Sequence, residues 1–259
     1  MAVKPVVHAE HVMGTVVSFD VRLDDEADRA AMSAAVDDAV RWLHRVDEVY
    51  STYRDDSQIS RLGRGDLSLA DCDPDVAEVL DLCAQVTSET RGYFSSMYAG
   101  LLDPSGLVKG WAVERASGVL VAAGSRRHCV NGGGDMQVVG EVEPGAPWQI
   151  GIAHPLHREA YASVVQLRDG AVATSGVAER GAHVLDPFTG KPAVELASIT
   201  VVGTDLTRTD AYATAALAMG ARAREWLEQL VGYEAFAVLP DGRGWWTSGY
   251  PSVGSVPAG

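Results

Sequence analysis

Apolar residues recur at intervals of three and four positions in several stretches of the chain, a spacing that places them on one face of a helix. In residues 29–49 these positions include Met32, Val36 and Leu43. The pattern predicts helices at residues 29–49, 74–86, 105–123, 210–220 and 222–231, and a short helical turn at 58–62. Thr207 or Thr209 is expected to cap the helix at 210–220.

Other stretches alternate apolar and polar residues, which is typical of strands with one buried face. Strands are predicted within residues 6–23, broken at Gly14, and at 129–131, 136–139, 148–152, 162–167, 171–174 and 197–202. Asp169-Gly170 predicts a hairpin between the strands at 162–167 and 171–174, and Asp241-Gly242 predicts another. Residues 87–102 are expected to form a loop, and the tail from Tyr250 to be flexible. The fold class predicted is α+β, with mixed, largely antiparallel sheets and packed helices in a single domain over residues 1–259.

The helix at 105–123 carries a lysine, Lys109, in its first turn, where the helix dipole disfavours a cation. With the free N–H groups of a helix start, that lysine would form a site for an anion such as phosphate. The alternative is a solvated surface lysine. Beyond this helix, Gly132-Gly133-Gly134 would let a ligand lie directly against the backbone, or would form only a flexible turn.

Length and charge narrow the possible classes of protein. A chain of 259 residues is close to the upper limit for one hydrophobic core. The formal net charge of −14 argues against general nucleic-acid binding. The three scattered cysteines have no metal-binding or redox spacing and are expected to be buried thiols in a reducing compartment. No secretion signal or membrane-spanning run is seen, so a cytoplasmic location is expected.

Two further clusters contain residue types that carry chemistry. A lone histidine is more often structural than catalytic, but His183 lies close in sequence to Glu179, Arg180 and Asp186 in a polar, glycine-rich segment, which leaves a functional role open beside the structural one. Asp210 and Thr214 are four residues apart and share one helix face. A carboxylate with a hydroxyl suits Mg²⁺, which prefers oxygen ligands. The spacing alone favours the alternative, in which Asp210 merely favours the helix dipole and Thr214 is a surface residue.

Considered together, these segments resemble the FAD:protein FMN transferase (ApbE-like) family. The resemblance extends from about Met13 to Leu239 and lies in motifs that follow the family's order. The motifs are at residues 13–15 (MGT), 51–54 (STYR), 57–62 (SQISRL), 106–113 (GLVKGWAV), 131–135 (NGGGD), 174–176 (TSG), 183–192 (HVLDPFTGKP) and 210–214 (DAYAT).

The resemblance implies an enzyme that moves FMN from FAD onto a threonine or serine hydroxyl of a target flavoprotein and releases AMP. It implies a lobed fold with an FAD cleft, and Mg²⁺ held by the Asp210 carboxylate, the Thr214 hydroxyl and the Gly106 carbonyl. His183 would be the general base, and Lys109 would face the FAD phosphates. Met13, Tyr53, Asp103 and Leu185 match positions that contact FAD.

The chain departs from the family pattern in three respects. Phe94-Ser95 stands where a Phe-Asp pair is usual, the segment from there to Asp103 is shorter by roughly twenty residues, and the lipoprotein anchor is not seen. A compact, cytoplasmic transferase is therefore expected. An FAD pyrophosphatase that yields FMN and AMP, and an FAD-binding protein without turnover, remain alternatives. The sequence does not identify the target or the oligomeric state.

Overall fold

A computed structural model describes residues 3–98, 100–176 and 184–251 of the chain. Its centre is an eight-stranded sheet in the order β1-β2-β5-β6-β9-β10-β11-β12, and every neighbouring pair is antiparallel. The predicted α+β fold is therefore confirmed. The strands are β1 (Val6–Val12), β2 (Thr15–Val21), β5 (His128–Gly132), β6 (Asp135–Val139), β9 (Gly170–Gly176), β10 (Ser198–Gly203), β11 (Glu234–Val238) and β12 (Gly244–Trp246).

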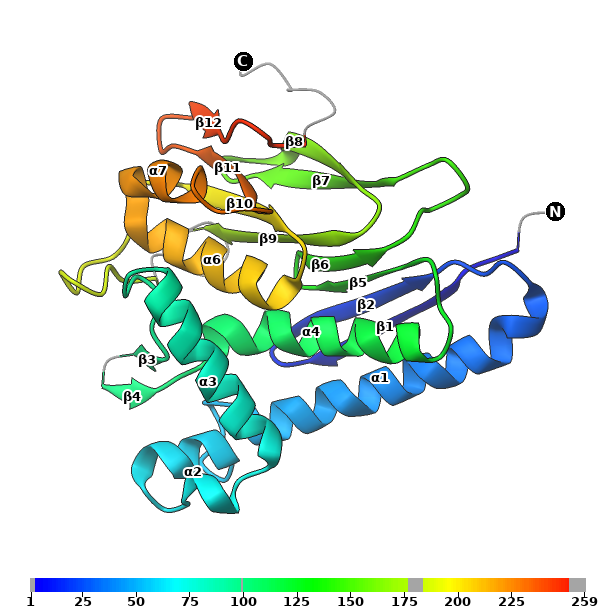
Figure 1. Ribbon diagram of the computed structural model, residues 1–259, viewed down its shortest axis with the longest axis horizontal. Coiled ribbons are helices and arrows are strands. Elements are labelled where there is room, and N and C mark those ends of the chain that lie inside the picture. The colour runs from blue at the N-terminus through cyan, green and yellow to red at the C-terminus, as the bar shows by residue number, and fades with distance from the viewer. Residues whose placement is uncertain (1–2, 99, 177–183, 252–259) are drawn as a thin grey trace.

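Three long helices cover one face of this sheet and enclose the main core (Figure 1). α1 (Arg29–Tyr50) contacts β1, α4 (Ser105–Ala122) contacts β5 and β6, and α6 (Leu206–Met219) contacts β9 and β10. Among the described residues, the other helices are α2 (Gln58–Arg64), α3 (Pro74–Glu89) and α7 (Ala223–Leu227), with 3-10 turns at Glu26–Asp28, Leu69–Asp71 and Gly220–Arg222. The three-and-four spacing of apolar residues thus correctly predicted the buried faces of α1, α3 and α4.

A two-stranded ribbon, β7 (Trp148–His154) and β8 (His157–Leu167), packs on the opposite face of the sheet. It forms a second, smaller apolar cluster in which Ile150 and Val165 meet Val138 and Val172 of the sheet. The predicted hairpin between residues 162–167 and 171–174 is therefore wrong. β8 pairs with β7, whereas β9 pairs with β6 and β10, so Asp169-Gly170 turns the chain from the ribbon into the sheet.

Three local predictions also need correction. The side chain that caps α6 is Asp205, which accepts a hydrogen bond from the Arg208 N–H, and not Thr207 or Thr209. The last predicted helix is much shorter, because α7 ends at Leu227 and the chain then turns toward β11. The expected loop at 87–102 contains the end of α3 and a small hairpin, β3 (Met97–Tyr98) and β4 (Leu101–Leu102). The expected flexible tail lies almost wholly outside the described residues.

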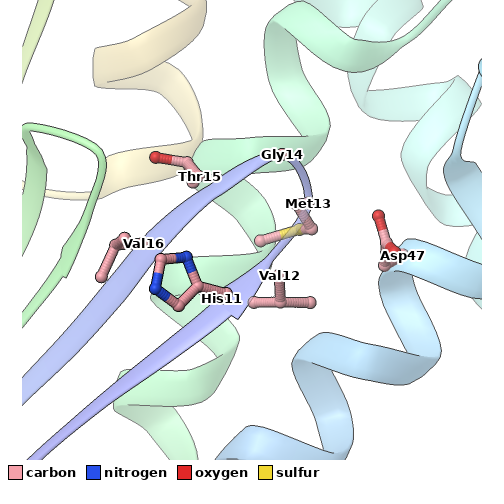
Figure 2. Close-up of a pocket in the computed structure, with 7 residues that line it drawn as sticks. All are labelled: His11, Val12, Met13, Gly14, Thr15, Val16 and Asp47. Atoms are coloured by element: carbon pink, nitrogen blue, oxygen red, sulfur yellow. The ribbon is translucent and has the colours of Figure 1, made fainter.

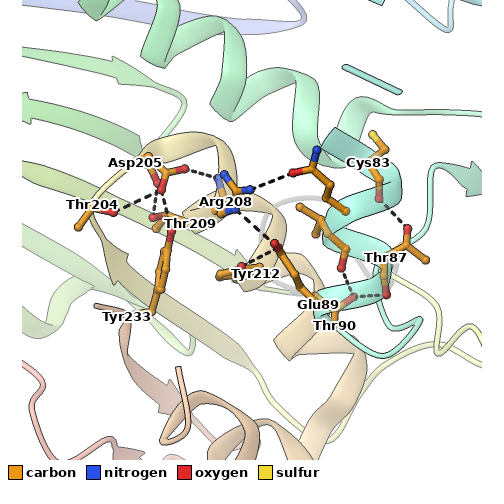
Figure 3. A network of polar contacts seen from close by, with 12 residues as sticks. Cys83, Thr87, Glu89, Thr90, Thr204, Asp205, Arg208, Thr209, Tyr212 and Tyr233 are labelled. Atoms are coloured by element: carbon orange, nitrogen blue, oxygen red, sulfur yellow. Dashed lines mark hydrogen bonds and ion pairs between the residues drawn. The ribbon is translucent and has the colours of Figure 1, made fainter. Parts of the chain in front are cut away.

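Polar contacts attach α3 to the start of α6 (Figure 3). Glu89 accepts a hydrogen bond from the Tyr212 hydroxyl at 2.8 Å and pairs with Arg208. Arg208 also donates to Gln85, and the Tyr233 hydroxyl donates to Asp205 at 2.6 Å. These contacts fix the first turns of α6, which carry Asp210.

The cysteines behave as the sequence predicted only in part. All three are free thiols, but only Cys83 is fully buried, while Cys72 and Cys129 are partly accessible. Burial raises the pKa of the Cys83 and Cys129 thiols to about 12, so both stay protonated at neutral pH. Over the described ranges, no helix has the length and apolar character needed to cross a bilayer.

Candidate active site

The site forms where the first turns of α4 and α6 touch, and a glycine allows that contact. A Cβ on Gly110 would lie 2.5 Å from the Leu206 carbonyl oxygen and 2.8 Å from the Asp210 Cβ. Without a side chain at Gly110, its N–H donates to Asp210 Oδ2 at 3.0 Å. Asp210 is 4% exposed and its carboxylate contacts α4, so it does more than favour the dipole of its own helix.

Lys109 lies between two buried carboxylates. Its Nζ forms a direct ion pair with Asp135 and is 3.4 Å from each carboxylate oxygen of Asp210. The lysine side chain is 24% exposed, so the alternative of a solvated lysine is wrong as well. The unfavourable position of this cation at the helix start is offset by two carboxylates, which come from other elements of the fold.

Asp135 received no role in the sequence analysis, although it ends the glycine motif. Its Oδ1 accepts the Thr174 N–H at 2.9 Å, and the residue is 2% exposed. The preceding turn is well defined, because Asn131 Oδ1 accepts the Gly134 N–H at 2.8 Å. The signal that could have identified Asp135 was an acidic residue placed directly after three glycines at a strand start.

The three residues predicted to hold Mg²⁺ lie close together. A Cβ on Gly106 would be 3.8 Å from Thr214 Cγ2, and Thr214 is one helical turn beyond Asp210. The Thr214 hydroxyl is 3.4 Å from the Ser175 hydroxyl of β9, which the sequence analysis did not single out. Residues from α4, α6 and β9 therefore meet at one point.

The chemistry of this group fits a hard divalent cation. Among the described residues, its polar atoms are oxygens apart from Lys109 and backbone N–H groups, and two carboxylates face one ammonium. In the described ranges, no cluster of three or more His, Cys, Asp or Glu side chains is placed to hold a metal. A cation here would need the hydroxyl and carbonyl ligands that the sequence predicted, and the Mg²⁺ ligand set stays a prediction.

Met13 lies in the tight turn between β1 and β2, where Met13 and Gly14 both have positive φ, 53° and 68°. It lines an open hollow of about 490 Å³ together with His11 and Asp47 (Figure 2). The neighbouring Thr15 touches the glycine turn, since a Cβ on Gly133 would be 2.4 Å from its Oγ1. The Met13 turn is thus adjacent to the turn that positions Asp135.

The other predicted FAD contacts are spread more widely. Tyr53 follows α1 and is 99% exposed, so its ring is available to a ligand. Asp103 Oδ1 accepts the Ser105 N–H at 3.0 Å and so supports the start of α4. Leu185 forms an isolated bridge with Pro192, and Phe188 in the same turn packs against Tyr93 at a centroid distance of 4.9 Å. His183, the predicted base, lies outside the described residues, as do Glu179 and Arg180.

A sequence model of the ApbE family matches residues 13–103 and 98–237 of the chain. The chain belongs to the ApbE family. Two relatives named FAD:protein FMN transferase match about half of it. The Vibrio cholerae protein is 30% identical over 129 residues, which are 46% of this chain and 39% of that protein. The Rhodobacter capsulatus protein is 35% identical over 135 residues, which are 49% of this chain and 25% of that protein.

Solved structures of the family share the fold over nearly the whole chain. The flavin transferase ApbE from Vibrio cholerae superposes with a TM-score of 0.80 at 21% identity, covering 95% of this chain and 97% of that chain. The ApbE protein from Thermotoga maritima gives a TM-score of 0.81, also at 21% identity and with the same coverage. This ApbE chain therefore has the family's architecture. In it, Lys109, Asp135 and Asp210 meet beside Gly106 and Thr214.

Proposed function

We propose that this ApbE-family chain is a Mg²⁺-dependent FAD:protein FMN transferase. The observation that carries the proposal is the convergence of Lys109 with two buried carboxylates beside Gly106 and Thr214. Such a group suits a metal-bound diphosphate, and the names of the relatives match this chemistry.

In the proposed reaction, a serine or threonine hydroxyl oxygen of the acceptor protein attacks the phosphorus on the FMN side of the FAD diphosphate. The new bond is a phosphoester to the acceptor, the bond that breaks is the diphosphate P–O bond, and AMP leaves with the bridging oxygen. Asp210, Thr214 and the Gly106 carbonyl would hold Mg²⁺, which supplies charge neutralisation at the phosphates. His183 accepts the hydroxyl proton, a role that suits a side chain with an ordinary pKa near 6.5.

Lys109 contributes a positive charge to the same phosphates, together with the free N–H groups at the start of α4. Met13, Tyr53, Asp103 and Leu185 would orient the nucleotide. Because Tyr53 projects into solvent, it would stack on an aromatic ring of FAD from outside and shield it from water.

Replacement of Asp210 tests the proposal. Asp210→Ala is expected to reduce transfer at least about a hundredfold, because the one charged ligand of the proposed Mg²⁺ site is lost. The measurement is mass spectrometry of the flavin adduct on an acceptor flavoprotein, with AMP quantified in parallel. Asp205→Asn is the matched control on the same helix, since asparagine keeps the cap to the Arg208 N–H, and full transfer is expected.

Undiminished transfer by Asp210→Ala with an intact fold would refute the metal assignment. Release of AMP and free FMN by the wild type without any acceptor would show an FAD pyrophosphatase. Tight FAD binding with no AMP under any condition would show a non-catalytic flavin-binding protein.

A further inference from the structure

The ion pairs at the site present a conflict between Lys109 and a metal ion. Asp210 is the only carboxylate in the proposed ligand set, yet the Lys109 ammonium is 3.4 Å from both of its oxygens. Two cations near one carboxylate compete for it and repel each other. A divalent cation can bind Asp210 tightly only if another carboxylate retains the ammonium.

Asp135 has the geometry for that task. It makes the direct ion pair with Lys109, whereas Asp210 is the more distant of the two carboxylates. Its Oδ1 is fixed by the Thr174 N–H, so the carboxylate cannot follow the lysine toward Asp210. The glycine turn before it is held by Asn131, which fixes the start of β6.

We propose that Asp135 is a positioning residue that retains the Lys109 ammonium when a divalent cation binds Asp210. This inference rests on the proposed function. A Mg²⁺ bound by Asp210, with Lys109 retained by Asp135, would place two cations near a diphosphate. With a neutral residue at 135, Lys109 would have Asp210 as its remaining carboxylate and would compete with the metal there.

A double-mutant cycle on Mg²⁺ binding tests the inference without any turnover. Asp135→Asn keeps the size of the side chain and its acceptor for the Thr174 N–H, and it should weaken Mg²⁺ binding by at least about tenfold, as loss of an outer partner of a ligand typically does. Asp135→Asn combined with Lys109→Met should regain wild-type affinity to within about threefold, because the competing cation is gone. Affinity is measured by isothermal titration calorimetry with Mg²⁺ alone.

Glu114→Gln provides the matched control. Glu114 is an acidic residue of α4 that accepts hydrogen bonds from the Thr207 N–H and hydroxyl, and thus also joins α4 to α6. Its replacement should leave Mg²⁺ affinity unchanged. In transfer assays Asp135→Asn should raise the apparent KM for Mg²⁺ by a similar factor, with kcat at saturating Mg²⁺ nearly retained, a split that general misfolding would not produce.

Failure of the inference is distinguishable from failure of the proposed function. If the wild type binds Mg²⁺ and transfers FMN, but Asp135→Asn binds Mg²⁺ equally well, only the inference is overturned. It is also overturned if the loss in Asp135→Asn persists in the double variant, since Asp135 would then act directly on the metal or on the fold. A wild type that binds no Mg²⁺ would overturn both.

Discussion

The helix α4 and the strands β5 and β6 form a unit that buries polar groups at both ends. The buried groups are charged at one end and neutral at the other. At one end, Lys109 and Asp135 are charged and paired. At the other, His128 is fully buried between two hydroxyl groups, with Ser117 Oγ 2.7 Å from Nε2 and Ser125 Oγ 2.9 Å from Nδ1. Burial lowers the pKa of His128 to about 4, so this imidazole is neutral at physiological pH.

The difference separates a functional region from a structural one. A neutral histidine bonded to two serines has no further capacity for a ligand, and it serves the packing of β5 against α4. At the other end, two carboxylates face one ammonium beside hydroxyl groups, and these oxygen atoms are suited to bind a cation. A titratable group in the core is therefore a weak sign of function unless its partners leave charge or bonding capacity unused.

The largest effect on stability is expected from Gly110→Ala at the charged end. The new Cβ would lie 2.5 Å from the Leu206 carbonyl oxygen, and a backbone atom cannot move aside as a side chain can. We expect a loss of about 2–4 kcal/mol in the free energy of unfolding, together with loss of transfer, because α4 and α6 must separate. Urea denaturation followed by circular dichroism measures the first, and the flavin-adduct assay the second. Wild-type stability would contradict the close helix contact.

The next largest effect is expected in the pH dependence of the free energy of unfolding, and it comes from His128 at the neutral end. The folded-state pKa of His128 is lowered to about 4, below its ordinary value of 6.5, so the unfolded chain binds the proton more readily. The contribution to stability is present above pH 6.5, declines as the pH falls, and stops changing below about pH 4. Between pH 7 and pH 5 the loss from this group should be about 2 kcal/mol.

His128→Gln provides the comparison, because glutamine is uncharged at every pH and can also bond the two serines. Urea denaturation should show that the free energy of unfolding falls more between pH 7 and pH 5 in the wild type than in the variant. An equal fall in the two proteins would mean that His128 is not buried as a neutral group.

A smaller effect is expected at the contact between α4 and α6 that lies away from the ion pairs. Glu114→Gln keeps the acceptor for the Thr207 N–H but removes the charge from both hydrogen bonds. We expect a loss of about 1 kcal/mol in the free energy of unfolding, measured by urea denaturation, since hydrogen bonds to charged groups exceed neutral ones by about that amount. A loss as large as that of Gly110→Ala would contradict the special role assigned to Gly110.

The smallest effect, and the opposite sign, is expected from Gly118→Ala, two turns beyond Gly110 on the same helix. A Cβ on Gly118 meets no atom within 4 Å, and the residue is exposed. Alanine should raise the free energy of unfolding by about 0.5–1 kcal/mol through helix propensity alone. A higher melting temperature in thermal denaturation, with unchanged transfer activity, would confirm the prediction. A destabilised variant would show that the helix packs against another part of the protein at this position.

Much of the architecture could be predicted because it is encoded locally. The stripes of α1 and α4, the Met13-Gly14 turn and the turn at Asp241-Gly242 follow from residue spacing and turn chemistry. The motifs at 106–113, 131–135 and 210–214 indicated the family before any contact was known. The α6 cap was missed, because Asp205, Thr207 and Thr209 are all good capping residues and only the path of the chain selects among them.

The sequence by itself thus determined most of the helices and strands and the residue types available for chemistry, because helix and strand periods involve neighbours along the chain. Tertiary structure alone decided that β8 pairs with β7, that Asp135 pairs with Lys109, and that Ser175 meets Thr214. The Lys109–Asp135 and Ser175–Thr214 contacts join residues distant in sequence, and they depend on how closely α4 and α6 pack across the sheet. The packing permitted by Gly110 brings a lysine, two aspartates and a threonine to one place.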